Sequence, residues 1–254
     1  HNSGIGGCVR ALTGGGWGFV CFNSLIGLRD KVSTAVTNSK VVNGEEIKLA
    51  PVKPAVDVVS ATLLKDPTEV SLVDKKALLD QYIDIIWHTP RIASSNLRYG
   101  DGRRRVVFCN SEGTYTDQEK VDVVFGASAM ARKDGDIQQS NLSIGSSGDF
   151  SLVEDLHTEI EEIAKKAVNL LDAPQVEGKE YTVVLDPVLA GVFIHEAFGH
   201  LSEADHVYED QRMKDIMVLG KRFGGSHLNV VDGADVPGLR GSYKYDDEGV
   251  RSSR

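Results

Sequence analysis

Between residues 91 and 150 the chain alternates apolar and polar residues, whereas the segments on either side follow a helical period. A period of two is typical of β-strands that have one buried face. Turn sequences divide this stretch at Gly100-Asp-Gly102, Asn110-Ser-Glu-Gly113 and Asp134-Gly135. The stretch therefore predicts the meander of an antiparallel sheet, which any fold of this chain must accommodate. The segments predicted as strands are 91–99, 103–110, 115–119, 120–133 and 137–144.

Helices are predicted where apolar residues recur at three- and four-residue steps. The clearest case is 151–171, where Ser151 and Glu154 have the spacing of a capping box. Two further helices are predicted over 28–42 and 69–87. Because helices and strands occupy separate parts of the chain, the pattern indicates an α+β fold.

The two ends of the chain complete this order. Residues 5–26 predict a β-hairpin around a glycine-rich turn at 13–18. Residues 181–185 predict a short strand, and a helix then begins with Asp186 as N-cap and Pro187 in its first turn. The predicted fold is therefore an N-terminal hairpin and helices, the meander, a long helix, a strand and a final helix. Short strands are also predicted at 216–219 and 227–231.

The charge balance and the cysteines limit the class of protein. With 28 basic and 37 acidic residues the net charge is −9, which disfavours a nucleic-acid partner. No apolar run approaches the roughly 18 residues that a membrane helix needs, and we expect no signal peptide. The three cysteines, Cys8, Cys21 and Cys109, are scattered and odd in number, which favours a reducing cytoplasm over a disulfide framework. Since the chain opens on His1 and closes without a terminating element, we expect a piece of a longer protein.

The final predicted helix carries the residues with the clearest chemistry. His195 and Glu196 are adjacent, and His200, Glu203 and Asp205 follow within a few residues. Imidazole nitrogen is a good zinc ligand, and a neighbouring glutamate can take a proton from the attacking water. Glu203 and Asp205 could be further ligands, or they could accept the N–H of an imidazole. The cluster favours a metal site over a pair of structural histidines.

The spacing of the two histidines is unusual for a metal helix. Zinc peptidases commonly place two histidines four residues apart, one above the other on a helix. Here five residues separate His195 from His200, which on a regular α-helix leaves the side chains about 140° apart. A π-turn would return them to one face, and Gly199 would ease such a distortion. The sequence therefore predicts either an irregular helix or no shared ion.

A catalytic zinc has three protein ligands and one open position. His195 and His200 would supply two of them. Glu203, His206 or Cys109 could supply the third, and no spacing in the sequence decides among them.

The stretch from His195 to Asp205 resembles the signature of the TldD/PmbA family of metallopeptidases, His-Glu-Ala-x-Gly-His-x-x-Glu-x-Asp, and more narrowly its TldD branch. The resemblance covers essentially the whole chain in the family's order. Individually weaker matches are Gly14-Gly-Gly-Trp-Gly-Phe19, Asn110-Ser-Glu-Gly113, Gly238-Leu-Arg-Gly-Ser-Tyr243 and Asp246-Asp-Glu-Gly249.

The resemblance implies a zinc-dependent metallopeptidase that cleaves flexible or unfolded peptides. It implies that His195 and His200 bind Zn²⁺ and that Glu196 is the catalytic base. The third ligand in the family is a cysteine of the C-terminal domain, which would lie beyond residue 254. Without that ligand we expect the chain to bind zinc weakly and to be inactive.

The resemblance also implies an organisation and a partner. We expect an N-terminal α+β domain over 1–186, and the metal-motif helix with the start of a truncated central or C-terminal domain over 187–254. The expected partner is a PmbA-like (TldE) subunit that lacks the metal, or a second copy of the chain. The alternative hypotheses are a non-catalytic subunit or peptide-binding module on the same scaffold, and a domain with structural histidines. The intact His195, Glu196 and His200 favour the peptidase.

Overall fold

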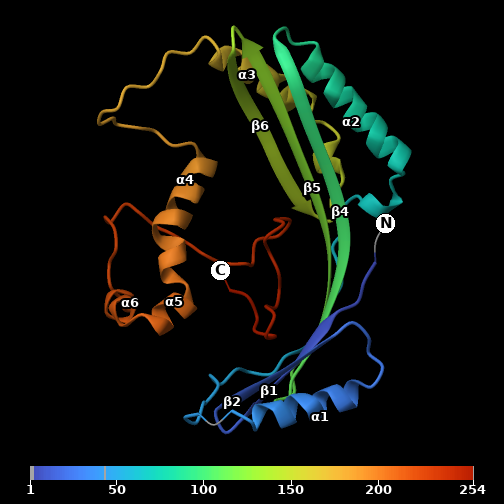
Figure 1. Ribbon diagram of the computed structural model, residues 1–254, viewed down its shortest axis with the longest axis vertical. Helices are drawn as coiled ribbons and strands as arrows, with labels where there is room; N and C mark the ends of the chain where they lie inside the picture. The colour runs from blue at the N-terminus through green and yellow to red at the C-terminus, as the bar shows by residue number, and fades with distance from the viewer. Residues whose placement is uncertain (1–2, 43, 254) are drawn as a thin grey trace. The chain divides into compact units, whose positions relative to one another are not determined.

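The computed structural model describes residues 3–42 and 44–253, and it divides into two compact units, His1–Lys53 and Pro54–Arg254. The division concerns compactness alone, and the expected domains 1–186 and 187–254 stay a prediction. The predicted α+β class is confirmed: a hairpin, a mixed sheet and packed helices follow one another along the chain (Figure 1).

The first unit is a hairpin covered by one helix. Strands β1 (Gly7–Thr13) and β2 (Gly16–Phe22) pair antiparallel, and helix α1 (Leu28–Ser39) packs against both. Gly14 and Gly15 form the turn with φ of 57° and 91°, the left-handed geometry that glycine adopts without strain. A side chain at Gly18 would place its Cβ 2.0 Å from the carbonyl oxygen of Ala35, so this glycine permits the close approach of α1.

The second unit is built on one four-stranded sheet. Its strands are β3 (Val56–Val59), β4 (Ile92–Cys109), β5 (Tyr115–Lys133) and β6 (Asp136–Ser147). β5 pairs antiparallel with β4 along nearly its whole length and with β6 over its second half, and the three strands run side by side in Figure 1. The sheet is not purely antiparallel, because β3 pairs parallel with the first four residues of β5.

The predicted turn at Gly100-Asp-Gly102 is wrong. These residues continue β4 without interruption and pair with Val124, Val123 and Asp122 of β5. Long-range pairing outweighs the local turn preference, and the Asp101 carboxylate is held by Lys75 at 2.7 Å. The predicted strands 115–119 and 120–133 are likewise one continuous strand.

Two helices cover the sheet and form its core. Helices α2 (Leu72–Trp87) and α3 (His157–Leu170) pack against each other and on the strands. Alternate side chains of β5 are buried in this core, as a strand with one covered face requires. The buried Tyr82 donates its hydroxyl proton to the Val153 carbonyl oxygen at 2.6 Å and accepts the Leu156 N–H at 3.2 Å. The other large buried core side chains include Ile86, Val123, Phe125 and Ile160.

The long helix begins later than the pattern predicts. A 3₁₀ turn, η2 (Ser151–Val153), precedes α3, which starts at His157. The capping box is not formed, because the Ser151 hydroxyl bonds the Asp149 carboxylate and Glu154 pairs with Lys65. Both side chains therefore stabilise the approach to the helix and not its first turn.

The chain after α3 contains short helices and extended segments. Residues 181–185, predicted as a strand, are extended but pair with no other strand in the described chain, and Val184 is 98% exposed. The strands predicted at 216–219 and 227–231 do not form either. A strand needs a hydrogen-bonded neighbour, which the apolar pattern alone cannot supply.

The last residues return to the sheet. The buried Tyr245 donates to Asp57 on β3 at 2.8 Å, and its backbone exchanges two hydrogen bonds with the Gln118 side chain of β5, each of 2.9 Å. None of the helices within 3–42 and 44–253 combines the length and apolar character needed to cross a membrane.

Candidate metal centre

The predicted capping of the motif helix is confirmed. Helix α4 (Pro187–Ile194) begins at Asp186, whose carboxylate accepts the N–H groups of Val188 and Leu189 at 2.9 and 3.0 Å. Pro187 occupies the first turn, where its missing N–H costs no hydrogen bond. This cap fixes where the helix starts and therefore which residues reach its far end.

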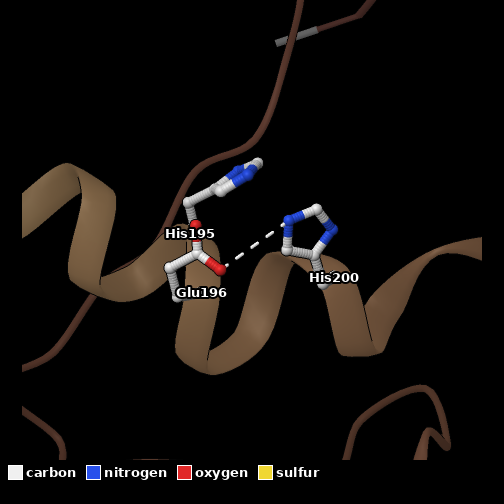
Figure 2. A group of neighbouring side chains, drawn as sticks. All are labelled: His195, Glu196 and His200. Carbon is white, nitrogen blue, oxygen red and sulfur yellow. Dashed lines mark ion pairs between the residues drawn. The ribbon is translucent and has the colours of Figure 1, made fainter.

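The helix widens where the histidines lie. His195–Gly199 form a π-helix, η3, in which the N–H of His200 reaches back to the carbonyl oxygen of His195. The two imidazole rings consequently lie with centroids 4.4 Å apart and planes at 67°. The π-turn expected from the five-residue spacing is thus confirmed, and both rings rise on one side of the ribbon in Figure 2.

Gly199 contributes less to this turn than the sequence suggests. Its backbone is right-handed helical, with φ −55° and ψ −56°, a conformation open to any residue. A Cβ added there would meet the His195 ring at 3.5 Å, which is an ordinary van der Waals contact. The π-turn therefore does not depend on the special freedom of glycine.

Three side chains meet at this turn. His195, Glu196 and His200 each offer a ligand atom, and these atoms lie within 4.8 Å of one another. Figure 2 shows the Glu196 carboxylate beside the two rings, with Oε2 3.8 Å from Nε2 of His200. All three side chains are exposed. Two imidazoles and one carboxylate are side chains that suit zinc, so these residues fit the ion. If Glu196 acts as a base, the two histidines are the only ligands here, and a third protein ligand is still needed.

Glu203 holds the second histidine in place. The 3₁₀ turn η4 (His200–Ser202) follows the π-helix and brings Glu203 Oε1 to 2.6 Å from Nδ1 of His200. This hydrogen bond, assisted by the charges of Glu203 and Glu196, raises the pKa of His200 above its usual value. When the neutral ring carries its proton on Nδ1 and donates that hydrogen bond to Glu203, its lone pair lies on Nε2, the atom that faces Glu196.

The remaining predicted residues lie close by but have other contacts. Asp205 accepts the backbone N–H of His206 at 2.9 Å, in the first turn of α5 (Ala204–Glu209). His206 places Nδ1 3.1 Å from the carbonyl oxygen of His200. Glu203, Asp205 and His206 form a second group, with ligand atoms within 4.8 Å of one another. The hydrogen bond between Glu203 and His200 connects this group to the first.

Cys109 joins neither group among the described residues.

One contact at the π-turn was not predicted from the sequence. The rings of Phe198, within the π-turn, and Phe223 lie with centroids 5.2 Å apart. Phe223 follows α6 (Gln211–Ile216) in an irregular segment, where no period predicts its neighbours.

A cavity of about 770 Å³ lies elsewhere in the second unit, between the sheet and the last residues of the described chain. Its walls come from the end of β3 and the residues that follow it, from the second half of β4, from near the start of β5, and from residues 234–252. None of the motif residues lines it. The candidate metal centre is thus an open surface cluster and not part of this hollow.

Two family profiles match the chain in succession. The PmbA/TldA metallopeptidase central domain matches residues 65–173, and the C-terminal domain of the same family matches residues 177–254. The chain belongs to the TldD/PmbA family. The motif helix and its π-turn lie within the part that matches the C-terminal domain.

Curated relatives in this family are named metalloproteases. One from Synechocystis is 41% identical over 251 residues, and one from Methanocaldococcus jannaschii is 35% identical over 259 residues. The matches cover 98% and 99% of this chain but 54% and 56% of those relatives. The chain therefore spans about half the length of the curated relatives it matches. A zinc metalloprotease TldD homolog from Saccharolobus solfataricus is 30% identical over 170 residues, which are 63% of this chain and 36% of that protein.

The fold has a counterpart among solved structures. A crystal structure from Bacteroides thetaiotaomicron, described as that of a candidate modulator of DNA gyrase, superposes with a TM-score of 0.70 over 97% of this chain and 58% of its own. At 15% sequence identity the likeness concerns the fold alone.

Proposed function

We propose that this chain carries the motif helix of a zinc metallopeptidase of the TldD branch. The observation that carries the proposal is the π-helix His195–Gly199, which brings two imidazoles and a carboxylate within 4.8 Å of one another. A helix that departs from α geometry at two metal-ligand residues is typical of a functional site. The metalloprotease names of the relatives support the same reaction class.

His195 and His200 would hold the ion through their imidazole nitrogens. When bound, zinc supplies Lewis acidity toward the scissile carbonyl and toward water. Glu196 would take a proton from the attacking water and later return it to the leaving amine, the task of a general base and acid. The position of its carboxylate, 3.8 Å from His200 Nε2, is consistent with that role.

Glu203 would act through His200 and not on the substrate. By accepting a hydrogen bond from the Nδ1–H group it fixes the ring's orientation and leaves Nε2 as the metal-binding atom. The exposure of the cluster supports the view that further protein is needed to enclose it. We propose that a cysteine of the C-terminal domain, downstream of the matched residues, completes the ligand set, as the resemblance to the family implies.

The proposed substrates are flexible or unfolded peptides. The proposed partner is a TldE/PmbA-like subunit or a second copy of the chain, and the proposed compartment is the cytoplasm. These three proposals rest on the resemblance to the family and, for the compartment, on the odd number of cysteines.

The decisive experiment compares zinc content and peptide cleavage in the full-length protein and three variants. His195→Ala and His200→Ala should lose both zinc and cleavage, because each removes a ligand. Glu196→Gln should keep the zinc and lose cleavage, because the amide cannot take a proton. Full zinc content in either histidine variant would refute metal ligation. Cleavage by Glu196→Gln at the wild-type rate would refute the base, and absence of zinc from the wild-type protein would favour the non-catalytic subunit.

A further inference from the structure

Two of the three cysteines, scattered in the sequence, are neighbours in the structure. Cys8 lies on β1 and Cys21 on β2, and the register of the hairpin sets them directly opposite each other. Both are free thiols, and both are exposed. Cys109 differs from them, since its register partner on β5 is Tyr115.

The geometry of the turn determines how close the two cysteines come. Gly14 and Gly15, with φ of 57° and 91°, make a two-residue turn of the I′ kind, and Thr13 and Gly16 close it. The closing pair of such a turn is hydrogen-bonded, and hydrogen-bonded and non-hydrogen-bonded pairs then alternate along the ladder. Cys8 and Cys21 are the fifth pair beyond it, so they form a non-hydrogen-bonded pair.

That parity matters because non-hydrogen-bonded pairs are the closer ones. Their Cα atoms lie about 4.5 Å apart, and their side chains approach more nearly than in the other kind of pair. A disulfide needs Cα atoms about 4.4–6.8 Å apart, so the backbone already meets the requirement.

The surroundings of the pair leave it open to a small reagent. Within the first unit, α1 packs on the face of the hairpin where Gly16 and Gly18 are buried. The two cysteines point to the opposite face. Loss of solvation and a hydrogen bond with the Cys21 thiol raise the pKa of the Cys8 thiol above its usual value. Most of the Cys8 side chains therefore carry a proton at neutral pH, which suits slow, reversible oxidation better than the reactivity of a catalytic nucleophile.

We propose that Cys8 and Cys21 form a reversible cross-strand disulfide, with a low-molecular-weight disulfide such as glutathione disulfide as the oxidant. The thiolate of one cysteine attacks glutathione disulfide, forms a mixed disulfide and releases one glutathione. The thiolate of the other then attacks the protein sulfur of that mixed disulfide and releases the second glutathione. Two protein thiols are thus oxidised and one glutathione disulfide is reduced to two glutathione molecules, with both thiol protons taken up by the departing thiolates.

The bond would tie β1 to β2 at the end of the ladder away from the turn. Because it is exposed, it belongs to the class of disulfides that are readily reduced again. A reducing compartment would keep the pair as thiols, and a rise in glutathione disulfide would close it. The inference does not depend on the metal centre, and it concerns a different unit of the chain.

The test is oxidation of the native chain in glutathione buffers, followed by trapping of free thiols, digestion with trypsin and mass spectrometry. Cleavage after Arg10 and Arg29 places Cys8 in peptide 1–10 and Cys21 in peptide 11–29. Cleavage after Arg105 and Lys120 places Cys109 in peptide 106–120. We expect the linked pair 1–10 and 11–29 to be the dominant oxidised product, lighter by two hydrogens than its separate peptides, and to disappear on reduction.

Three controls make the result specific. Cys8→Ser and Cys21→Ser should each abolish the linked product, whereas Cys109→Ser should leave its yield unchanged. Oxidation in concentrated urea should lower the preference for this pair at least several-fold, because the strand register that sets the two residues opposite is then lost. Separate glutathione adducts on Cys8 and Cys21 without linkage would overturn the proposal. So would links to Cys109 in comparable yield, or the same preference in urea.

Discussion

The imidazole rings of His195 and His200 lie with centroids 4.4 Å apart although five residues separate them in sequence. A regular α-helix would direct these side chains about 140° apart, so the contact exists only because residues 195–199 are wound as a π-helix. The spacing of the two histidines and the winding of the helix must therefore match, and a change in one without the other should separate the rings.

Inserting one alanine between Ala197 and Phe198 tests this match. The histidines then lie six residues apart, which neither α nor π winding brings onto one face, with a misalignment of about 120° in the α-helix. Zinc affinity of the full-length protein should fall on the order of 100-fold or more, since one ligand is lost. Competition with a chromogenic chelator measures the change. An alanine inserted beside Gly178, in an exposed segment, is the control, and equal affinity in the two insertions would contradict the prediction.

Glu203→Ala should weaken zinc binding without removing a ligand. It deletes the acceptor of the 2.6 Å hydrogen bond from His200 Nδ1, and partners of this kind are typically worth about 10–100-fold in metal affinity. Glu203→Gln keeps an acceptor oxygen and should recover most of the loss. Nitrogen chemical shifts of His200 in the metal-free protein give a second measurement, because loss of the partner should raise the share of the tautomer protonated at Nε2.

Glu209→Ala is the matched control for Glu203. It removes the same charge from an exposed residue of α5, and it should change neither the affinity nor the tautomer. If Glu203→Ala behaves like Glu209→Ala while the wild-type protein binds zinc, the positioning role fails and the metal site stands. If the wild-type protein itself binds no zinc, the proposed function fails first.

The stability of the second unit should fall at low pH because of Asp172. Hydrogen bonds from Lys133 and Arg91 lower the pKa of this carboxyl from 3.8 to about 2. Because the folded-state value lies below the unfolded one, the carboxylate stabilises the fold above about pH 4 and loses that contribution as the pH falls to about 2. Asp172→Asn should lower Tm at neutral pH, and its deficit should shrink toward pH 2.

Thermal unfolding followed by circular dichroism at several pH values checks the Asp172 prediction. Glu180→Gln, at an exposed position, serves as the control and should show little deficit at any pH. A deficit for Asp172→Asn that stays constant from pH 7 to about pH 2 would show that the ion pairs with Arg91 and Lys133 do not hold the carboxylate ionised.

Tyr82→Phe should destabilise the second unit by about 1–3 kcal/mol. The hydroxyl joins α2 to the start of α3 through the Val153 carbonyl and the Leu156 N–H, and all of these groups are buried. Its loss leaves a buried donor and acceptor without partners, which costs more than the bonds themselves contribute. Denaturant unfolding measures the change. Tyr115→Phe removes an equivalent hydroxyl from a ring that is 41% exposed, and a similar loss there would contradict the argument from burial.

Local patterns predicted those parts of the structure whose neighbours are close in sequence. The hairpin at 5–26, the apolar stripe that forms α2, the Asp186 cap and the π-turn all follow from spacings within a few residues. The TldD/PmbA signature could likewise be recognised from His195 to Asp205 alone.

The errors lie where distant segments decide the structure. Gly100-Asp-Gly102 has the composition of a turn, yet β5 pairs with it and Lys75 holds Asp101. The parallel pairing of β3 with β5 joins residues almost sixty positions apart, which no local period encodes. Cys8 and Cys21 look unrelated in sequence, and only the register of the hairpin makes them a pair.

The central strand β5 has a consequence for how the second unit comes apart. Within the described chain, β3, β4 and β6 each pair with β5 and not with one another. The inward side chains of β5 also form much of the core. Local opening of a protein usually releases segments whose contacts are few. Here β3 or β6 can detach singly, but loss of β5 removes every ladder at once. The amide hydrogens of β5 that bond to β4 should therefore exchange only when the whole unit unfolds, so their exchange rates would report its global free energy of unfolding.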